Sequence, residues 1–430
     1  MKKTHYLITT LVLILSFTSS CKDEVFETFK ANAPVYMSYE DLRSAVKMTE
    51  AREMNNPGKI YFKDQYIFIN EKMEGVHVYD VSDPANPQNK GFIEIPGNVD
   101  IAIKDNILYA DSYVDLVSID VSSFTAIAEV GRVEKVFPYT LPKYNEKLPV
   151  AKLDETKGVV IGWEEKSVRQ EIETRYYPNY YSWEGKSMDD SYFASPGLSG
   201  GTAGTTFGVG GSMARFGLYK DFLYIVNQFN LLTFKLNSNS EVTLLDTRQV
   251  GWNVETLFIT DNHLFLGTQS GMLVLSLEVP ERPSQTGSFS HITACDPVVI
   301  KGDLAFVTLK GGTTCRGATV NQLDVVKMSD GYTKFTMLKT YPMFGPQGLG
   351  IDDELLFVCD GDAGLKIYNA ADPLTITDHL VASFPSINAY DVIPMNSYLF
   401  MIGESGFLLY DYSNIQNIKQ IGFIPVVKKA

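Results

Sequence analysis

The apolar positions of this chain recur with a period of about forty residues. Seven short apolar runs each contain an aromatic residue, and successive aromatics lie 41, 115, 41, 41, 51 and 43 residues apart; they are Phe68, Tyr109, Tyr224, Phe265, Phe306, Phe357 and Phe400. The interval of 115 is one 41-residue step plus a 74-residue insertion. Eight residues before each aromatic stands another apolar residue: Ile60, Ile101, Phe216, Leu257, Val298, Leu349 and Val392. In six of the seven units an apolar residue also lies six residues before the aromatic, and this period of two predicts a strand that packs on one face.

Each unit continues in the same order of strands and turns. A polar turn such as Lys63-Asp64-Gln65 precedes the aromatic strand, and a third strand such as Val76–Val81 follows it. A Pro/Asn turn such as Ser82–Pro87 then leads to a weaker fourth strand. Seven units of four antiparallel strands predict an all-β chain folded as a seven-bladed β-propeller. The first unit begins with its innermost strand, so the ring is expected to close without strand exchange.

Two segments resemble a known repeat. Leu356–Pro373 and Gly75–Pro84 are similar to the LVIVD repeat of bacterial propeller proteins, and the resemblance spans roughly residues 57–427 apart from the insertion. It implies the propeller fold and no particular chemistry.

The N-terminus predicts export and a lipid anchor. Lys2 and Lys3 precede an apolar stretch from Tyr6 to Phe17, and small residues lead to Cys21. This stretch is shorter than the roughly 20 residues that span a bilayer. The segment ending at Cys21 resembles a bacterial lipobox of Bacteroidetes type, and Lys22-Asp23-Glu24 resembles the tag that directs such lipoproteins to the outer leaflet. The alternative is an ordinary signal peptide with a chance cysteine.

The predicted organisation has three parts. Residues 1–20 are a signal peptide, residues 21–56 a lipid-anchored tether with one short helix, and residues 57–430 the propeller, with an insertion at about 139–212. The helix is expected from Ser38 to about Arg52, capped by Ser38 and packed outside the first or last blade. Val35–Met37 is a candidate extra strand for a blade.

Charge limits the class of partner. The formal net charge of −14 becomes −16 when Lys2 and Lys3 are removed with the signal peptide. An acidic chain without a basic tract binds nucleic acid and anionic lipid poorly, so no nucleic-acid partner is expected. Neither GxGxxG after a strand nor a complete phosphate-binding loop is present, and we predict no cofactor.

Three cysteines follow Cys21. Cys295 begins the inner strand of the fifth unit, and Cys315 lies between the second and third strands of the same unit. Both positions fall on one face of the blade, so an exported protein is expected to join them in a disulfide. Cys359 ends a strand and is expected to be buried and free. The cysteines lack paired CxxC spacing, so no metal site is predicted.

The insertion is the least repetitive segment and hence the candidate for specific contacts. It is expected to open on the same face as Cys295 and Cys315. Amphipathic aromatic residues are enriched at interfaces, and the insertion holds a dense set of them: Tyr176, Tyr177, Tyr180, Tyr181 and Trp183. These rings either form the core of the insertion or stack on a glycan or protein partner, and both interpretations stay open.

A polar ring is expected at the channel mouth. Nine residues before each aromatic stand Lys59, Asp100, Arg215, Thr256, Pro297, Gly348 and Asp391, and His291 precedes an inner strand on the same face. Two carboxylates and two cations there predict either a salt-bridge network between blades or a site for acid/base chemistry. No Ser-His-Asp or multi-histidine constellation follows from local spacing, so no catalytic residue is predicted. The sequence favours a surface-displayed binding or scaffolding lipoprotein; the alternative is a propeller hydrolase or lyase with its site at the mouth.

Overall fold

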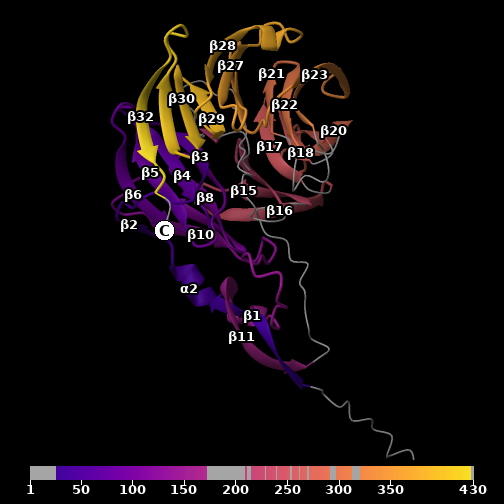
Figure 1. Ribbon diagram of the computed structural model, residues 1–430. Helices are drawn as coiled ribbons and strands as arrows, with labels where there is room; N and C mark the ends of the chain where they lie inside the picture. The colour runs from indigo at the N-terminus through magenta and orange to yellow at the C-terminus, as the bar shows by residue number, and fades with distance from the viewer. Residues whose placement is uncertain are drawn as a thin grey trace, which may run out of the picture. The chain divides into compact units, whose positions relative to one another are not determined.

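The structure is a computed structural model that describes residues 26–171, 209–210, 215–227, 229–238, 240–251, 254–260, 262–268, 271–290, 297–311 and 320–427. The chain divides into two compact units. The first takes in the chain up to Met37 together with Leu141–Tyr180, and the second takes in Ser38–Thr140 and the chain from Tyr181 onward. Figure 1 labels their helices and strands.

The second unit is a seven-bladed β-propeller of four-stranded antiparallel blades, as the repeat predicts. Blade 1 consists of β3 (Pro57–Lys63), β4 (Tyr66–Glu71), β5 (Gly75–Asp80) and β6 (Gln88–Glu94). Blade 2 consists of β7 (Ile101–Lys104), β8 (Ile107–Ser112), β9 (Asp115–Asp120) and β10 (Ala128–Val133). Blade 3 consists of β13 (Phe216–Tyr219), β14 (Phe222–Val226), β15 (Asn230–Leu236) and β16 (Val242–Gln249). Blade 4 consists of β17 (Val254–Thr260), β18 (His263–Thr268), β19 (Gly271–Ser276) and β20 (Ser284–Ser290). Blade 5 is β21 (Val298–Lys301), β22 (Leu304–Lys310), β23 (Asn321–Ser329) and β24 (Lys334–Pro342). Blade 6 consists of β25 (Leu349–Asp352), β26 (Leu355–Cys359), β27 (Leu365–Asn369) and β28 (Leu380–Phe384), with a 3₁₀ turn, η3 (Ile376–Asp378), between β27 and β28. Blade 7 consists of β29 (Ala389–Met395), β30 (Tyr398–Gly403), β31 (Gly406–Asp411) and β32 (Lys419–Pro425).

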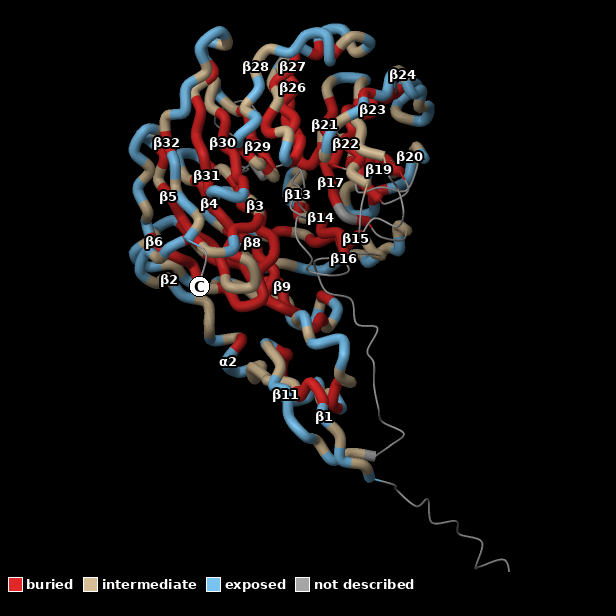
Figure 2. Tube along the Cα trace, viewed as in Figure 1, coloured by how far each residue is buried: buried red, intermediate tan, exposed pale blue. Residues whose placement is uncertain are grey.

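The repeating aromatics form the core between blades. All seven lie on second strands and are at most 3 % exposed, and the seven apolar residues eight positions earlier are equally buried. Figure 2 shows the buried residues concentrated along the strands. A side chain buried at one height in every blade explains the forty-residue period, because each blade packs its face against the next. Cys359 ends β26, buried and free, as predicted.

The ring closes by packing, without strand exchange. Each blade consists of four consecutive strands. Blades 1 and 7 share one hydrophobic cluster, in which the rings of Phe62 and Phe400 stack with centroids 5.1 Å apart. An isolated parallel bridge between Met54 and Val426 joins the segments next to β3 and β32.

The predicted helix proved much shorter than expected. Helix α2 covers only Tyr39–Ser44, with the Ser38 hydroxyl capping the amide of Asp41. The chain then forms strand β2 (Lys47–Thr49), which pairs with the outer edge of blade 1 through β6. This pairing satisfies edge backbone groups that a continued helix would leave open. Inside the ring of strands, the two-residue strand β12 (Val209–Gly210) pairs with β3, so the first sheet has six strands.

The expected tether is in fact a paired strand. In the first unit β1 (Phe26–Met37) pairs antiparallel with β11 (Val159–Glu171) along its full length, with Phe26 opposite Glu171. Val35–Met37 therefore joins the insertion, and the expectation that it extends a blade was wrong. A 3₁₀ turn, η1 (Glu155–Lys157), precedes β11.

A buried asparagine fixes this ribbon to the start of the insertion. The Asn32 side chain is 1 % exposed, and its amide nitrogen donates to the carbonyl oxygens of Asn145 (2.9 Å) and Leu148 (3.0 Å). The Asn32 backbone bonds Pro149 and Ala151. The non-repeated segment thus braces the N-terminal strand.

One face of the propeller carries the connections on which the predicted site residues lie. First strands begin and second strands end on the same face, because the strands of each blade alternate in direction. We call it the top face. The fourth strand of one blade returns to the first strand of the next on this face, and the insertion is one such connection, between β10 and β13.

Candidate functional site

Three of the predicted mouth residues meet on the top face. Lys59 lies on β3, Asp100 directly precedes β7 and Arg215 directly precedes β13, so each belongs to a different blade. The Lys59 ammonium nitrogen lies 2.7 Å from Asp100 Oδ2, and the backbone amide of Arg215 donates to the same oxygen. Asp100 Oδ1 accepts from the amide of Ile101 at 2.8 Å. Both oxygens of this buried carboxylate are therefore engaged.

A second carboxylate, which the sequence did not single out, lies beside the first. Asp111 ends its apolar run on β8, and its Oδ1 accepts from the amides of Val99 and Asp100, both at 2.9 Å, and from Asn98 Nδ2 at 2.8 Å. Within the described residues its Oδ2 is buried and has no hydrogen-bond partner. Burial raises the pKa of Asp111 to about 6, and the neighbouring charge of Asp100 raises it further.

The cation at the site is also desolvated. Only 15 % of the Lys59 side chain is exposed. Burial lowers the pKa of Lys59, and the nearby Arg215 lowers it further, whereas Asp100 acts in the opposite direction. Lys59 thus forms an ion pair with Asp100 in surroundings where an unpaired charge would destabilise the fold.

Amide side chains extend the cluster into blade 1. Asn70 ends β4 and donates through Nδ2 to Asn98 Oδ1 at 2.7 Å, and Asn98 in turn donates to Asp111. Gly58 lies against these amide side chains, because a Cβ atom there would clash with Asn70 Oδ1. The signal that could have found Asn70 and Asp111 is their shared place, two residues after the repeating aromatic.

The geometry is that of an ion-pair network between blades, one of the two interpretations that the sequence left open. Lys59, Asp100 and the Arg215 amide connect blades 1, 2 and 3. The Arg215 contact also fixes the chain where it re-enters the propeller after the insertion. Asp111 is the one carboxylate of the cluster whose second oxygen remains available for a proton.

The other predicted site residues are not part of this cluster. Asp391 lies on β29 of blade 7 and is 1 % exposed. It is accommodated by a glycine on blade 6, because a Cβ atom on Gly348 would come within 2.9 Å of Asp391 Oδ1. The remaining candidates lie outside the described residues and stay predictions: Cys21, His291, Cys295, Cys315, Tyr176, Tyr177, Tyr180, Tyr181 and Trp183.

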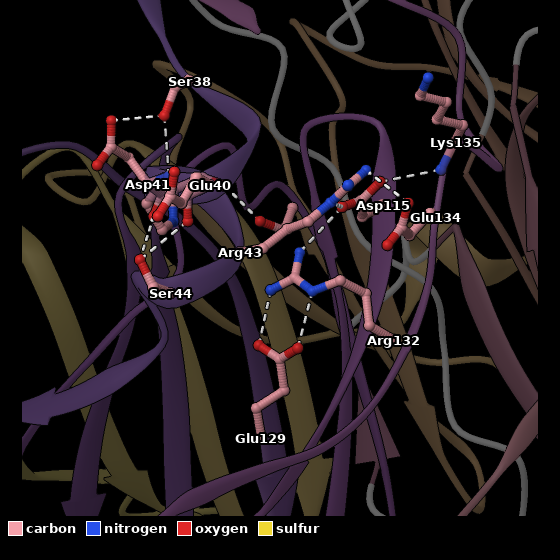
Figure 3. A network of polar contacts seen from close by, with 12 residues as sticks. Ser38, Glu40, Asp41, Arg43, Ser44, Asp115, Glu129, Arg132, Glu134 and Lys135 are labelled. Atoms are coloured by element: carbon pink, nitrogen blue, oxygen red, sulfur yellow. Dashed lines mark hydrogen bonds and ion pairs between the residues drawn. The ribbon is translucent and has the colours of Figure 1, made fainter.

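A second polar network on the top face fixes helix α2 to blade 2 (Figure 3). Asp115, fully buried at the start of β9, accepts from Arg43 Nε at 3.0 Å and from Arg132 Nη1 at 3.1 Å. Arg132 also forms a two-pronged contact with Glu129, at 2.7 and 2.6 Å. The helix was expected on the outside of the first or last blade. It contacts blade 2 instead, where Arg43 forms an ion pair with the buried carboxylate of Asp115.

Two kinds of site are not found in the described part of the chain. Among these residues no three His, Cys, Asp or Glu side chains are grouped so that they would hold a metal ion. None of the helices described here is both long and apolar enough to cross a membrane.

Comparison with known proteins supports the fold. No protein-family model matches the sequence, and no curated protein matches it significantly. Among solved structures, a protein from Lactobacillus plantarum aligns with a TM-score of 0.52 at 11 % identity, over 86 % of this chain and 97 % of that one. The periplasmic gluconolactonase of Pseudomonas aeruginosa aligns with a TM-score of 0.51 at 10 % identity, over 86 % and 96 %. A putative 6-phosphogluconolactonase from Bacteroides fragilis aligns with a TM-score of 0.50 at 9 % identity, over 87 % and 96 %. At such low identity these similarities define a propeller and leave the activity open.

Proposed function

We propose that the protein is an outer-membrane lipoprotein, displayed at the cell surface, whose propeller binds or scaffolds a partner through its top face. The observation that carries this proposal is the engagement of the expected acid/base groups with one another. Lys59, Asp100 and the Arg215 amide hold three blades together. Groups committed in this way stabilise a platform and are poorly placed to exchange protons with a substrate.

The anchor follows from the N-terminal sequence. Cys21 after a short apolar stretch would carry the lipid, and Phe26, five residues later, begins strand β1. Five extended residues reach at most about 18 Å. The β1–β11 ribbon would therefore begin close to the membrane, and the rest of the chain would follow from a braced strand.

The insertion is not repeated in the other blades, so it can provide contacts that are specific to this protein. Its five aromatic residues, 176–183, follow β11 directly in the chain and are the proposed contacts for a glycan or protein partner. If one of them is an anchor, its replacement by alanine costs about 2 kcal/mol or more of binding and leaves stability nearly intact. If it is a core residue, the same change costs about 3–5 kcal/mol of stability.

Alanine variants of Tyr180 and Trp183 separate these outcomes when partner capture and denaturant unfolding are measured on the same samples. Loss of capture with unchanged unfolding supports the proposal. Unfolding of every variant at lower denaturant, with capture retained by the folded fraction, would refute the contact assignment.

A hydrolase or lyase is the second candidate, favoured by one specific observation. Asp111 has a pKa raised to about 6 beside a second carboxylate and a cation, a pattern also found in catalytic acids. Two proteins of similar fold are a gluconolactonase and a putative 6-phosphogluconolactonase. Turnover of a sugar lactone that disappears in Asp111→Asn would support this candidate over a pure binding role.

A further inference from the structure

Blades 1 and 7 are neighbours in the ring, but no stretch of chain leads directly from one to the other. In every other pair the fourth strand of one blade leads into the first strand of the next on the top face. Strand β32 is the last of the described strands, and β3 is the first strand of blade 1. The contact between these two blades, here called the seam, therefore depends on noncovalent interactions alone.

Residues 52–56, which precede β3, lie at the seam, and we call them the clasp. Met54 of the clasp is 1 % exposed and belongs to the hydrophobic cluster that blades 1 and 7 share. Its carbonyl oxygen accepts from the amide of Val427 at 2.8 Å, and Met54 forms a parallel bridge with Val426, directly after β32. The clasp is thus bound to the end of blade 7.

One buried carboxylate binds the clasp to blade 1. Glu71 ends β4 and is 1 % exposed. Its Oε1 accepts from the amide of Asn56 at 2.6 Å, and its Oε2 accepts from the amide of Asn55 at 3.1 Å. The amide of Lys72 donates to the carbonyl oxygen of Asn56 at 3.1 Å. The clasp therefore forms hydrogen bonds with both blades of the seam.

A buried histidine contacts the same carboxylate. His77 on β5 is fully buried, and its Nε2 lies 2.9 Å from Glu71 Oε2. Its Nδ1 is buried without a partner in the described part of the chain. A buried N–H group without an acceptor is costly, so we assign the proton of the neutral ring to Nε2, which donates to Glu71. Glu71 thus accepts hydrogen bonds on both oxygens, as an ionised carboxylate does.

These hydrogen bonds favour the ionised form of Glu71. Burial alone would raise its pKa, but the hydrogen bonds from His77 and from the amides of Asn56 and Asn55 outweigh burial, so the pKa lies below the ordinary value of 4.5. Protonation of Glu71 would replace one of its acceptor sites with an O–H donor.

The other ionisable groups near Glu71 are paired or neutral. Arg52 of the clasp forms an ion pair with Glu74 at 2.6 Å. Burial, together with the charge of Glu71, raises the pKa of Tyr79 to about 12, so Tyr79 is neutral. Glu71 is therefore the buried group whose protonation acts directly on the hydrogen bonds of the clasp.

We infer that the clasp is an acid-sensitive closure of the propeller ring. Ionised Glu71 holds the amides of Asn55 and Asn56, and its protonation releases them, which opens the seam while the individual blades stay folded. A carboxyl group whose folded pKa lies below its unfolded pKa contributes stability that is present above the unfolded pKa and is lost as pH falls through the folded pKa. The clasp is thus closed above about pH 4.5 and opens below it. The inference concerns the propeller itself and does not depend on which partner the top face binds.

Hydrogen–deuterium exchange of the full chain tests this, because opening of the clasp exposes the amides of Asn55, Asn56 and Val427. Glu71→Gln imitates the protonated acid, since glutamine keeps the shape of the side chain but has one acceptor oxygen. At pH 7 these three amides are expected to exchange about tenfold faster or more in the variant. The amides of β5 and β31 are expected to exchange at the wild-type rate.

Glu94→Gln is the matched control. Glu94 also lies on blade 1, but its side chain is 38 % exposed and forms an ion pair with Lys47 at 3.1 Å. This substitution should leave exchange in the clasp unchanged. The wild-type protein supplies a further arm that needs no variant: between about pH 5 and about pH 3.5, clasp protection corrected for intrinsic exchange should fall more steeply than that of β5 and β31.

Three results would overturn the inference: wild-type protection of the clasp in Glu71→Gln, an equal loss of protection in β5 and β31, or wild-type clasp protection that does not change with pH. An equal loss would show that Glu71 stabilises the whole fold and not the seam. If Glu71→Gln does not fold, the pH series on the wild-type protein decides.

Discussion

At the scale of single residues, the ionisation of Asp111 makes stability depend on pH. Its folded pKa of about 6 lies above the ordinary value of 3.8. The unfolded chain therefore loses this proton first as pH rises, and the stability contributed by the neutral form, complete below about pH 4, disappears by about pH 6 to 7. A difference of about two pKa units corresponds to about 3 kcal/mol.

Asp111→Asn tests this directly. Asparagine keeps an oxygen for Asn98, Val99 and Asp100 but cannot ionise. Denaturant unfolding at several pH values between 4 and 7 should give a wild-type stability that falls relative to the variant as pH rises. Parallel curves for the two proteins would contradict the assignment of a protonated Asp111.

The same cluster predicts a large cost for removing its cation. Lys59→Met leaves the Asp100 carboxylate buried with only backbone donors, and breaking one partner of a buried pair costs about 3–5 kcal/mol. Lys301→Met is the matched control, since Lys301 and Glu354 form an ion pair at 3.5 Å with side chains 36 % and 54 % exposed. The control should change the free energy of unfolding by less than about 1 kcal/mol. Equal effects of the two substitutions would argue against a buried network at Lys59.

At the scale of elements, α2 is held by the buried side chain of Leu42 and by the ion pair of Arg43 on blade 2. Arg43 is the residue of this six-residue helix that contacts the buried Asp115. Short helices are marginal without tertiary contacts, so Arg43→Met should release α2 locally. In this variant Asp115 still forms its ion pair with Arg132 and still accepts from the Lys135 amide, so blade 2 should remain folded.

Hydrogen–deuterium exchange measures this release. Amides of Tyr39–Ser44 should exchange about tenfold faster or more in Arg43→Met, while those of β8 should be unchanged. Unchanged exchange in α2 would show that other contacts hold the helix, and faster exchange throughout blade 2 would show a wider role for Arg43.

The elements differ in how well sequence alone predicts them. The blades were predictable because one aromatic, such as Phe357, must fill the same core position in every unit. Strand β1 could not be predicted in the same way, because its partner strand is distant in the sequence. Lys30 of β1, for example, forms an ion pair with Glu165 of β11, 135 residues later. Its small residues Ala31 and Ala33 carry little apolar signal, although both are buried. Asp111 was missed for a related reason, since a polar residue at the end of an apolar strand looks like the start of a turn.

At the scale of the whole molecule, seven regular blades form the propeller, and the non-repeated insertion interrupts one connection on its top face. Repeated packing builds the blades, and hydrophobic contacts between blades 1 and 7 close the ring. An ion pair joins blades 1 and 2, and the backbone amide of Arg215, where the chain re-enters the repeat, donates to the same carboxylate. Such a framework suits the presentation of contact residues on its connecting loops, as the proposed binding function requires.

The central claim, a lipid-anchored platform at the outer membrane, is tested most directly by fractionating cells that express wild type or Cys21→Ala and weighing the N-terminal peptide. Acyl chains partition strongly into lipid. The wild-type protein should therefore be recovered in the outer membrane with diacylglycerol on Cys21, and the variant should be released or keep its signal peptide. Wild-type protein recovered soluble from the periplasm, without an acyl mass on that peptide, would contradict the account.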